Sequence, residues 1–389
     1  MNILHVIEDN KFYNEIINVF DCTHHKCEYV CVVDDECENF RIIKSDRIKL
    51  IHKSECNQLW SNNDIDIYMF HPLSGGTDDW VLSIPKQKKI IASSWGYDLY
   101  CSQNGLPPLL DIRIYGDETS KIIKDINKPN VLRRLRRVLG KIYYCKRNRE
   151  RKKERQIEVH TQKQVLERID YWATVLPIEY EMLKHECCIG AERFPFQYSN
   201  RSLSDVYEKI DFETTNYILL GNSADPSNNH LDLIKLLQER GIIDSYSLYI
   251  PLAYGDERYK NWLKTYLESK TDKFIVQDEL IPINEYRKVL KSCRVAVFGH
   301  LRQQALGNII ENMLQGKKVF LYKDSMAYKY FIDRGAIVYN IEQDLCLKEI
   351  NSQLTEEQID INKKACDEFT IENVVSAVES ALNGFKRNL

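Results

Sequence analysis

The chain has 389 residues, 43% of them hydrophobic and 29% charged, and its formal net charge is -3. The length favours two domains over one, and the composition is that of an ordinary soluble globular protein. A net charge this close to zero gives no support to nucleic-acid binding.

The cysteines favour an intracellular chain. None of the 12 forms a CxxC pair, and no signal peptide is recognisable at the start of the sequence. We therefore expect reduced thiols and a cytoplasmic location. No apolar run is long enough to cross a bilayer, so any membrane association is expected to be peripheral.

The first half alternates predicted strands and helices, which indicates an α/β sheet with right-handed crossovers. The predicted strands are residues 2–7, 29–33, 65–70 and 89–92. Parallel strands end at one rim of a sheet, and a histidine there can transfer protons near neutral pH. Jointly the residues at these strand ends suggest an acceptor and catalytic face, although each alone is more often a hydrogen-bonded structural residue. They are His5, Asp9, His71 and Asp98.

A strongly basic segment breaks this pattern at residues 131–155, which hold 12 Lys and Arg against two Glu. Apolar residues lie between the charges at helical spacing, so the segment is predicted to form a basic amphipathic helix. Anionic lipid headgroups attract such a segment by about 1 kcal/mol per cation near the surface. A solvated helix folded on its own domain and a nucleic-acid patch are the alternatives. The candidate membrane-docking cations are Arg133, Arg134, Arg136, Arg137 and Lys141.

The α/β pattern resumes after this segment. Residues 158–161 are predicted to end a strand, and a helix is predicted from 165 to 171. The polar stretch 200–213 is the candidate linker, and the apolar residues 217–220 begin a second series of strands. Residues 298–322 read as strand, loop, helix and strand, which requires a parallel sheet.

These patterns predict two Rossmann-like α/β domains, residues 1–205 and 206–389. A cleft between two such domains is the usual place for a ligand. The amphipathic tail helix at residues 372–385 could pack back on the first domain.

Two strand-to-helix loops of the second half suit a phosphate-bearing ligand. In parallel sheets, ligands lie beyond the carboxyl ends of strands, where helix N-termini offer free N–H groups and a positive dipole end. Arg302 adds a guanidinium fork ahead of a helix that begins at Gly307 and Asn308. In the other loop, Gly221 lets the backbone approach a ligand closely. The further candidates in these loops are Asn222, Ser223, Ser227, Gln303 and Gln304.

Each of these residues also has a purely structural interpretation. Arg302 and the glutamines could equally well cap the helix and solvate the loop. Ser223 and Ser227 could cap the helix that starts near residue 228. Tyr254, in a third loop, could stack on a base, although a single tyrosine more often packs in the protein.

Two short patterns resemble metal sites, and we predict no metal at either. Asp64 and Asp66 form a DxD, but it precedes a strand and so lies at the wrong edge of the sheet. The spacing of Cys22, His24, His25 and Cys27 matches no common closed zinc site.

Several longer motifs carry a family resemblance. They are WGYDLY at residues 95–100, GNSADPSNNH at 221–230, PLAY at 251–254 and RQQALG at 302–307, together with the strand-end His71. Their order and spacing over most of the chain resemble the bacterial TDP-N-acetylfucosamine:lipid II N-acetylfucosaminyltransferases. These are the 4-acetamido-4,6-dideoxygalactose transferases of enterobacterial common antigen synthesis.

The resemblance implies a two-domain GT-B glycosyltransferase in which the first domain binds the acceptor and the second binds the nucleotide-sugar. It also implies a peripheral protein at the inner face of the cell membrane, where an undecaprenyl-linked acceptor resides. The basic segment would then dock on anionic lipid. This chain departs from the family because its basic insert is longer and its first half diverges outside WGYDLY and His71. The acceptor and the exact donor sugar are therefore not carried over.

The expected reaction is metal-independent transfer of a sugar, with no cofactor, in the synthesis of a surface polysaccharide such as capsule or O-antigen. Arg302, Ser223 and the amides of Gly307 and Asn308 would stabilise the leaving diphosphate. Glu311 could hold donor hydroxyls or form a salt bridge at the edge of the core.

The acceptor hydroxyl would be positioned or deprotonated by His71 or Asp98, and less readily by Asp9. An epimerase or phosphorylase on the same scaffold, and a non-catalytic assembly protein, are the competing interpretations.

Overall fold

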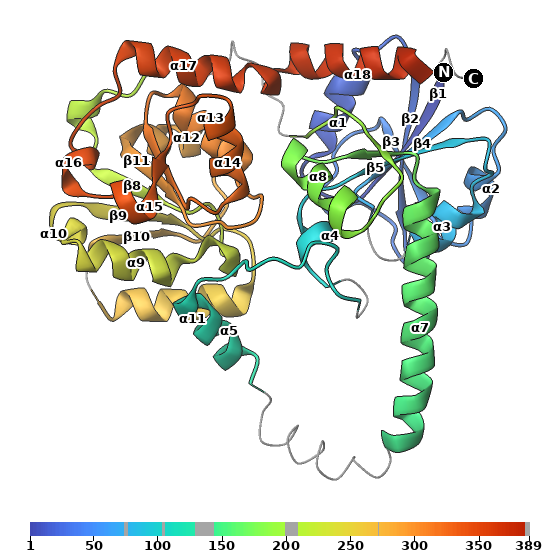
Figure 1. Ribbon diagram of the computed structural model, residues 1–389, viewed down its shortest axis with the longest axis horizontal. Helices are drawn as coiled ribbons and strands as arrows, with labels where there is room; N and C mark the ends of the chain where they lie inside the picture. The colour runs from blue at the N-terminus through green and yellow to red at the C-terminus, as the bar shows by residue number, and fades with distance from the viewer. Residues whose placement is uncertain (74–76, 103–105, 129–143, 199–208, 271, 386–389) are drawn as a thin grey trace. The chain divides into compact units, whose positions relative to one another are not determined.

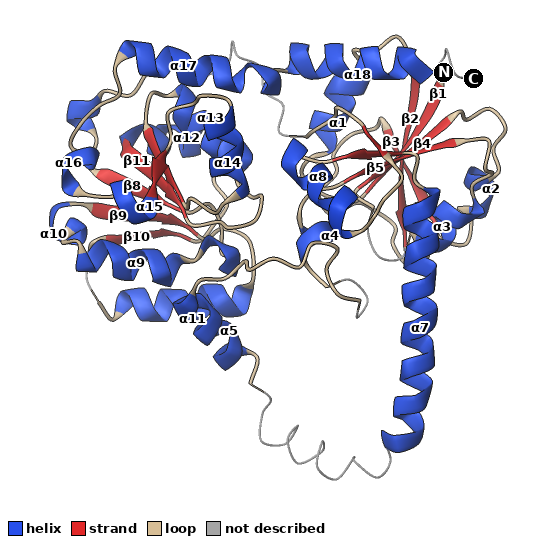
Figure 2. Ribbon diagram, in the orientation of Figure 1, coloured by secondary structure: helices blue, strands red, loops and turns tan. Residues whose placement is uncertain are grey.

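The computed structural model describes residues 1–73, 77–102, 106–128, 144–198, 209–270 and 272–385. These residues divide into two compact units. Unit 1 takes the described residues of 1–111, 136–202 and 369–389, and unit 2 takes those of 112–135 and 203–368. Each unit is a parallel sheet with helices packed on it (Figure 2).

The sheet of unit 1 has the strand order β3-β2-β1-β4-β5-β6-β7 among the described residues, and every pair is parallel. Its central strands are apolar runs because a sheet covered on both faces buries every side chain. The strands are β1 (Asn2–Ile7), β2 (Lys26–Val33), β3 (Ile48–His52), β4 (Ile67–His71), β5 (Lys89–Ser93), β6 (Tyr171–Ala173) and β7 (Glu192–Arg193).

The C-terminal helix of the chain belongs to unit 1. This helix, α18, lies beside α1, and the ring of its Phe385 stacks on Tyr171 with centroids 4.2 Å apart (Figure 1). Its Glu379 accepts a hydrogen bond from the backbone N–H of His24 at 3.0 Å. The helices of unit 1 are α1 (Tyr13–Phe20), α2 (Asn57–Trp60), α3 (Asp78–Ser83), α4 (Tyr97–Tyr100), α7 (Tyr144–Arg168), α8 (Pro177–Glu186) and α18 (Ile371–Phe385).

Unit 2 repeats the architecture with the strand order β10-β9-β8-β11-β12-β13 among its described residues. All of its strand pairs are parallel. The strands are β8 (Tyr217–Leu220), β9 (Ser247–Pro251), β10 (Phe274–Gln277), β11 (Cys293–Phe298), β12 (Lys318–Leu321) and β13 (Tyr339–Asn340).

Helices α9 and α11 lie on one side of this sheet, and α12, α13 and α14 lie on the other (Figure 1). The α-helices of unit 2 are α5 (Asp117–Ile126), α9 (His230–Glu239), α10 (Ile242–Ser245), α11 (Glu257–Glu268), α12 (Ile283–Ser292), α13 (Leu306–Leu314), α14 (Met326–Asp333), α15 (Ile341–Asp344), α16 (Leu347–Ile350) and α17 (Glu356–Cys366). Short 3-10 helices occur at η2 (Phe212–Thr214) and η3 (Pro226–Asn228), and η4 (Asp367–Phe369) precedes α18.

Helix α5 comes from the first half of the sequence but packs in unit 2. Its Ile122 is buried in the core of that unit, against α9 and α11. The carboxylate of Asp232 on α9 caps α5, because it accepts hydrogen bonds from the backbone N–H groups of Glu118 (2.9 Å) and Thr119 (3.0 Å) and from the Thr119 hydroxyl (2.6 Å). We refer to residues 112–126 as the strap.

The strap corrects the predicted domain boundary. A single boundary near residue 205 assigns residues 112–126 to the first domain, whereas the structure places them in unit 2. Helix α18 packs on unit 1, as predicted for the tail helix at residues 372–385. The strand end predicted at residues 158–161 is also wrong, because these residues lie within α7. Ile157 and Val159 are 66% and 48% exposed there, so they are apolar side chains on a helix surface and not part of a buried strand.

The membrane-docking candidates Arg133, Arg134, Arg136, Arg137 and Lys141 lie outside the described residues. Among the described residues, no helix combines the length and the apolar character needed to cross a membrane.

Candidate functional site

The candidate site of unit 2 lies where the order of its strands reverses. Strands β8 and β11 are parallel neighbours, and the chain continues from β8 to β9 on one side and from β11 to β12 on the other. The loops that follow β8 and β11 therefore diverge at the carboxyl edge of the sheet. Such a switch point is where doubly wound sheets bind ligands.

The loop after β8 begins at Gly221, a position that only glycine can occupy. Gly221 has φ +70°, and a Cβ there would lie 2.5 Å from Asn228 Oδ1 and 2.7 Å from His230 Nε2. The next residue fixes the loop, because the backbone N–H of Asn222 donates to Asn228 Oδ1 at 2.9 Å. Asn222 also donates from its side chain to the Tyr254 hydroxyl at 3.1 Å.

The two serines of this loop hold the loop itself. Ser223 Oγ accepts hydrogen bonds from Asn228 Nδ2 at 3.2 Å and from the Asp225 N–H at 3.4 Å. Ser227 Oγ donates to Asp225 Oδ1 at 2.6 Å and lies against the side-chain amide of Gln304. Neither serine caps α9, which begins after Asn229, a residue in the left-handed region.

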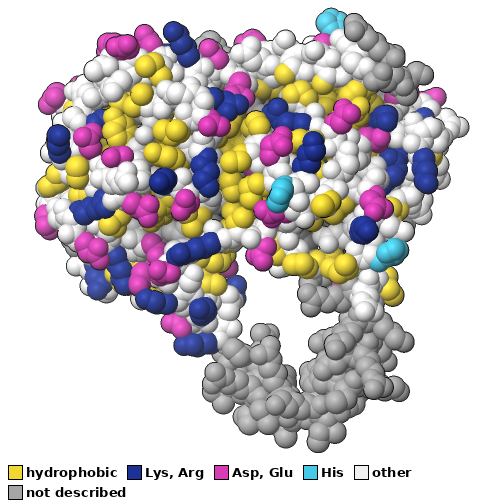
Figure 3. Space-filling view, viewed as in Figure 1, with side chains coloured by type: hydrophobic (Ala, Val, Ile, Leu, Met, Phe, Trp, Pro, Cys, Tyr) yellow, Lys and Arg dark blue, Asp and Glu magenta, His cyan; other side chains and the backbone are white. Residues whose placement is uncertain are grey.

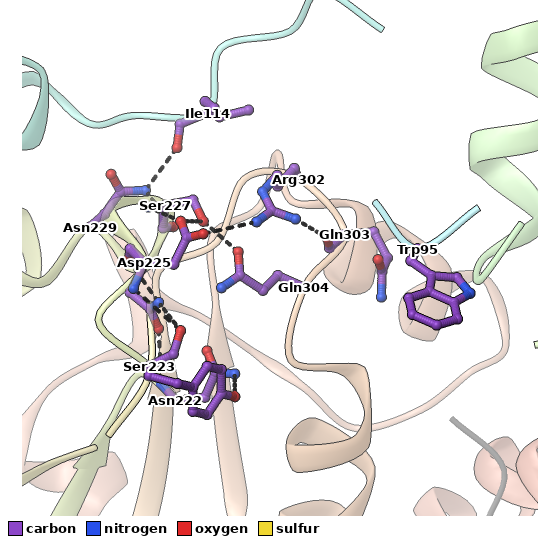
Figure 4. A network of polar contacts seen from close by, with 12 residues as sticks. Trp95, Ile114, Asn222, Ser223, Asp225, Ser227, Asn229, Arg302, Gln303 and Gln304 are labelled. Carbon is purple, nitrogen blue, oxygen red and sulfur yellow. Dashed lines mark hydrogen bonds and ion pairs between the residues drawn. The ribbon is translucent and has the colours of Figure 1, made fainter. Parts of the chain in front are cut away.

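Arg302 faces this loop from the loop after β11. Its side chain is only 8% exposed, and it forms an ion pair with Asp225 at 3.4 Å between Nη2 and Oδ2 (Figure 4). Arg302 Nη1 donates to the backbone carbonyl of Gln303 at 3.0 Å. In this structure a carboxylate therefore lies where the sequence predicts a phosphate contact for Arg302.

Helix α13 starts at Leu306, one residue before the predicted start. The residue ahead of it, Ala305, has φ +58° and a methyl side chain that cannot cap the helix. Gly307 and Asn308 thus contribute N–H groups of the first turn, which has no side-chain cap. The Asn308 side chain accepts a hydrogen bond from the Tyr286 hydroxyl at 3.2 Å.

Of the remaining candidates of unit 2, Glu311 and Tyr254 have protein partners, whereas Gln303 has a side-chain oxygen that is unpaired within the described ranges. Glu311 is 2% exposed and faces Arg287 at 3.5 Å, which is the salt bridge expected as the alternative to a ligand contact. Tyr254 is 39% exposed, and its backbone carbonyl accepts a hydrogen bond from the Ala224 N–H at 2.6 Å. Gln303 is 2% exposed, and its side-chain oxygen has no hydrogen-bond partner among the described residues.

Of the candidates in unit 1, His71 is part of the hydrophobic core. It is fully buried, its Nε2 lies 3.0 Å from Nδ1 of the equally buried His5, and the rings of Phe20 and Phe196 surround it. Burial lowers the pKa of His71 well below its usual value and that of His5 to about 3, so the pair is neutral. The structure thus places His71 beneath the rim of the sheet, away from the surface where an acceptor is expected to bind.

The two candidate aspartates of unit 1, Asp9 and Asp98, differ in the hydrogen bonds that their carboxylates accept. Asp9 accepts hydrogen bonds from the backbone N–H groups of Arg41 (2.6 Å), Ile42 (3.0 Å) and Ile43 (2.8 Å), so it holds a loop. Asp98 accepts one from the Trp95 N–H at 2.9 Å. Burial raises the pKa of Asp98 to about 6, against the hydrogen bonds of Trp95 and Ser94 that favour its charged form.

Several residues of the site were not predicted as ligands. Asp225 pairs with Arg302, and Asn229 links three segments by donating to Gly299 O (2.7 Å) and Ile114 O (3.2 Å) and accepting from the Gly116 N–H (2.8 Å). A Cβ on Gly299 would lie 2.5 Å from the Asn228 carbonyl, so this glycine lets the two loops meet. Asp225 and Asn229 belong to the largely polar stretch 221–230, which was the signal available in the sequence.

We predict that Gly221→Ala destabilises the protein more than Gly335→Ala. Both glycines have φ +70°, but a Cβ at Gly335 has no heavy atom within 4 Å. The Gly335 variant therefore incurs only the backbone strain of about 1–2 kcal/mol, whereas the Gly221 variant adds a steric clash. Thermal unfolding of the two variants measures the difference, and equal melting temperatures would contradict the packing described for Gly221.

We also predict a pH-dependent effect for Asp98→Asn. The folded pKa of about 6 exceeds the ordinary 3.8, so the folded state binds the proton more tightly. The free energy of unfolding of the wild type therefore falls as pH rises from about 4 to about 6. The variant lacks this loss, so its stability relative to wild type should rise by about 2 kcal/mol over that range. Urea unfolding at pH 4 and pH 7 tests this, and a pH-independent difference would contradict it.

Comparisons with known proteins identify the fold. The lipopolysaccharide outer core galactosyltransferase WaaB in its apo form aligns over 99% of both chains with a TM-score of 0.60 and 11% identity. Sucrose-phosphate synthase from Thermosynechococcus elongatus aligns over 100% of both chains with a TM-score of 0.64 and 10% identity. HepE from Anabaena, in complex with UDP-glucose, aligns over 99% of this chain and 100% of its own with a TM-score of 0.59 and 9% identity. The predicted GT-B fold is thereby confirmed.

The family follows from the sequence. Among curated proteins, none matches this chain closely enough to count as a relative. The family model described as 4-alpha-L-fucosyltransferase, glycosyl transferase group 56, matches residues 161–372, which is more than half of the chain. This match contains the loops after β8 and β11. The chain belongs to the 4-alpha-L-fucosyltransferase family, glycosyltransferase group 56, and is a glycosyltransferase.

Proposed function

We propose that the protein transfers a deoxyamino sugar from a nucleoside-diphosphate donor to a lipid-linked saccharide in bacterial surface polysaccharide synthesis. TDP-linked 4-acetamido-4,6-dideoxygalactose is the first donor to test, because of the motifs at residues 95–100, 221–230 and 302–307. The fucosyltransferase description of the family supports a 6-deoxy sugar. A neighbour of the same fold, HepE, is known in complex with UDP-glucose, which supports a nucleotide-sugar donor.

The observation that carries this proposal is the position of Arg302. It lies at the switch point of the unit 2 sheet, shortly before the uncapped first turn of α13. A guanidinium fork and free backbone N–H groups are the donors that a diphosphate needs. In our proposal they stabilise the negative charge that develops on the leaving diphosphate.

In our proposal, Asp225 and the donor phosphate compete for Arg302. Its contact with Arg302 is long for a charged hydrogen bond, at 3.4 Å, and its side chain is 39% exposed. A diphosphate carries more charge than one carboxylate and can accept from both Arg302 and the α13 amides. Donor binding therefore replaces Asp225 on Arg302.

On the acceptor side, we assign the proton-handling role to Asp98. Its pKa of about 6 leaves it mostly charged at neutral pH while still able to take a proton. Asp9 already binds three backbone N–H groups, and His71 is fully buried. Asp98 is also buried, at 4% exposed, but its raised pKa suits proton transfer, and it lies in WGYDLY, a motif on which the family resemblance rests.

Membrane docking is assigned to the basic segment at residues 131–155. On the visible face of the molecule, Lys and Arg are interspersed with Asp and Glu (Figure 3). The excess of 12 cations over two Glu in this one segment is therefore a local feature of the chain. Such an excess suits an anionic membrane surface, where an undecaprenyl-linked acceptor would be reached from the cytoplasmic side.

We predict that Arg302→Ala lowers the affinity for the nucleoside diphosphate by about tenfold to a hundredfold, because a charged hydrogen-bond fork is lost. Asp225→Asn should raise this affinity, because it removes the competing carboxylate. Arg334→Ala, which removes a cation paired with Glu368 elsewhere in unit 2, serves as the control. Calorimetry with the nucleotide that a thermal-shift panel of TDP, UDP, GDP and CMP selects measures these affinities.

Two outcomes would count against the donor site. If Arg302→Ala bound the nucleoside diphosphate with unchanged affinity, Arg302 would not belong to the donor site. If Asp225→Asn lost as much affinity as Arg302→Ala, Asp225 would support Arg302 and would not compete with the phosphate for it. If the wild type released no nucleoside diphosphate from any donor of a panel, the non-catalytic alternative would be favoured.

We further predict that replacing Arg133, Arg134, Arg136, Arg137 and Lys141 with Ser abolishes binding to anionic vesicles. At about 1 kcal/mol per cation, the loss exceeds a hundredfold. Co-sedimentation with phosphatidylglycerol-containing and purely zwitterionic vesicles measures it, with Lys363→Ser/Lys364→Ser on α17 as control. Equal sedimentation of both variants would refute the docking role.

A further inference from the structure

Two buried histidines, one after β11 and one at the start of α9, have ring nitrogens that are unsatisfied in the part of the chain that the structure describes. His300 follows β11 directly and is 3% exposed, and neither its Nδ1 nor its Nε2 has a hydrogen-bond partner among the described residues. His230, at the start of α9, is fully buried. Its Nδ1 lies 3.3 Å from the Tyr259 hydroxyl, while its Nε2 lacks a partner within the same residues and faces Gly221.

His300 is neutral in this position. Burial lowers its pKa well below the usual value, and the positive charge of Arg302 lowers it further. A neutral imidazole carries one N–H donor and one acceptor nitrogen. Leaving both unpaired in the interior costs stability, so such a group calls for an explanation.

The position of His300 separates it from an ordinary packing defect. Gln315 is also fully buried with both side-chain polar atoms unpaired among the described residues, but it follows the C-terminal end of α13. His300 instead lies at the carboxyl end of β11, two residues before Arg302 and beside the switch point. Substrate-binding groups are expected at that edge of the sheet.

The chemistry of the unpaired atoms indicates the kind of group that would satisfy them. Phosphate oxygens of a diphosphate only accept hydrogen bonds, so they would leave one nitrogen of His300 unpaired. In the loop after β8, Asn222 Oδ1 is also without a partner in the described part of the chain, and it needs a donor. Hydroxyl and acylamino groups both donate and accept, and in a nucleotide-sugar they are found on the sugar.

We propose that His300 hydrogen-bonds the transferred sugar of the donor and thereby helps to select it. This inference rests on the proposed function, since it presupposes a nucleotide-sugar in unit 2. His300 is 3% exposed and Asn229 holds the loops after β8 and β11 together. In this proposal the sugar therefore reaches His300 only once donor phosphates have taken Arg302 from Asp225 and the two loops have moved apart. His230 Nε2 faces Gly221, the first residue of the loop after β8.

The test compares a nucleotide with its sugar conjugate. Binding of TDP and of TDP-4-acetamido-4,6-dideoxygalactose to the wild type, His300→Phe and His300→Asn is measured by calorimetry. His300→Phe should bind TDP within about twofold of wild type but bind the TDP-sugar at least about tenfold more weakly. His300→Asn, which keeps a donor and an acceptor, should recover part of this loss. The melting temperature of His300→Phe should not fall, because an unpaired polar group has been replaced by an apolar ring.

The control is Gln315→Met, which removes unpaired polar atoms at the other end of α13 and should bind both ligands like wild type. Equal weakening of TDP and TDP-sugar in His300→Phe would make His300 a phosphate or loop-shaping residue and overturn the proposal. Unchanged binding of both would also overturn it, since His300 would then contact only the protein or a buried water. If the wild type bound neither compound, the proposed donor itself would be wrong, which is a separate result.

Discussion

The ion pair between Arg302 and Asp225 is the interaction on which the account of this glycosyltransferase depends. A guanidinium that is 8% exposed needs a compensating charge, and in the described residues Asp225 supplies it at 3.4 Å. The pair joins the loops after β8 and β11, which leave the sheet of unit 2 at its switch point. In the proposed function, a diphosphate accepts hydrogen bonds from the same guanidinium and from the first turn of α13.

The rest of unit 2 keeps these two loops in place. Gly221 and Gly299 remove side chains where the loops would otherwise collide with Asn228 and His230. Asn229 then ties the loops to the strap, whose helix α5 is capped by Asp232. The strap is continuous in sequence with the basic segment at residues 131–155, so the part of the chain proposed to meet the membrane directly follows an element that holds the donor loops.

Much of this could be predicted from local patterns. The parallel sheets follow from buried apolar runs such as Tyr217–Leu220 and Cys293–Phe298, and the Arg302 loop follows from its place between a strand and a helix. The position of the strap could not be predicted in this way, because the partners of Asn229 and Asp232 lie more than 100 residues away in sequence and leave no local signal. The burial of His71 also left no local signal, since the residues packed against it, such as His5 and Phe196, are distant in sequence. Local sequence patterns locate the helices and strands. The hydrogen-bond partner of each polar side chain, in contrast, depends on tertiary contacts.

The most direct measurement is a crystal structure of the protein with the bound nucleoside diphosphate. The account predicts diphosphate oxygens within hydrogen-bond distance of the Arg302 guanidinium and of the N–H groups of Gly307 and Asn308, with the Asp225 carboxylate displaced from Arg302. A nucleotide bound elsewhere in the chain, with the Arg302–Asp225 pair intact, would contradict it.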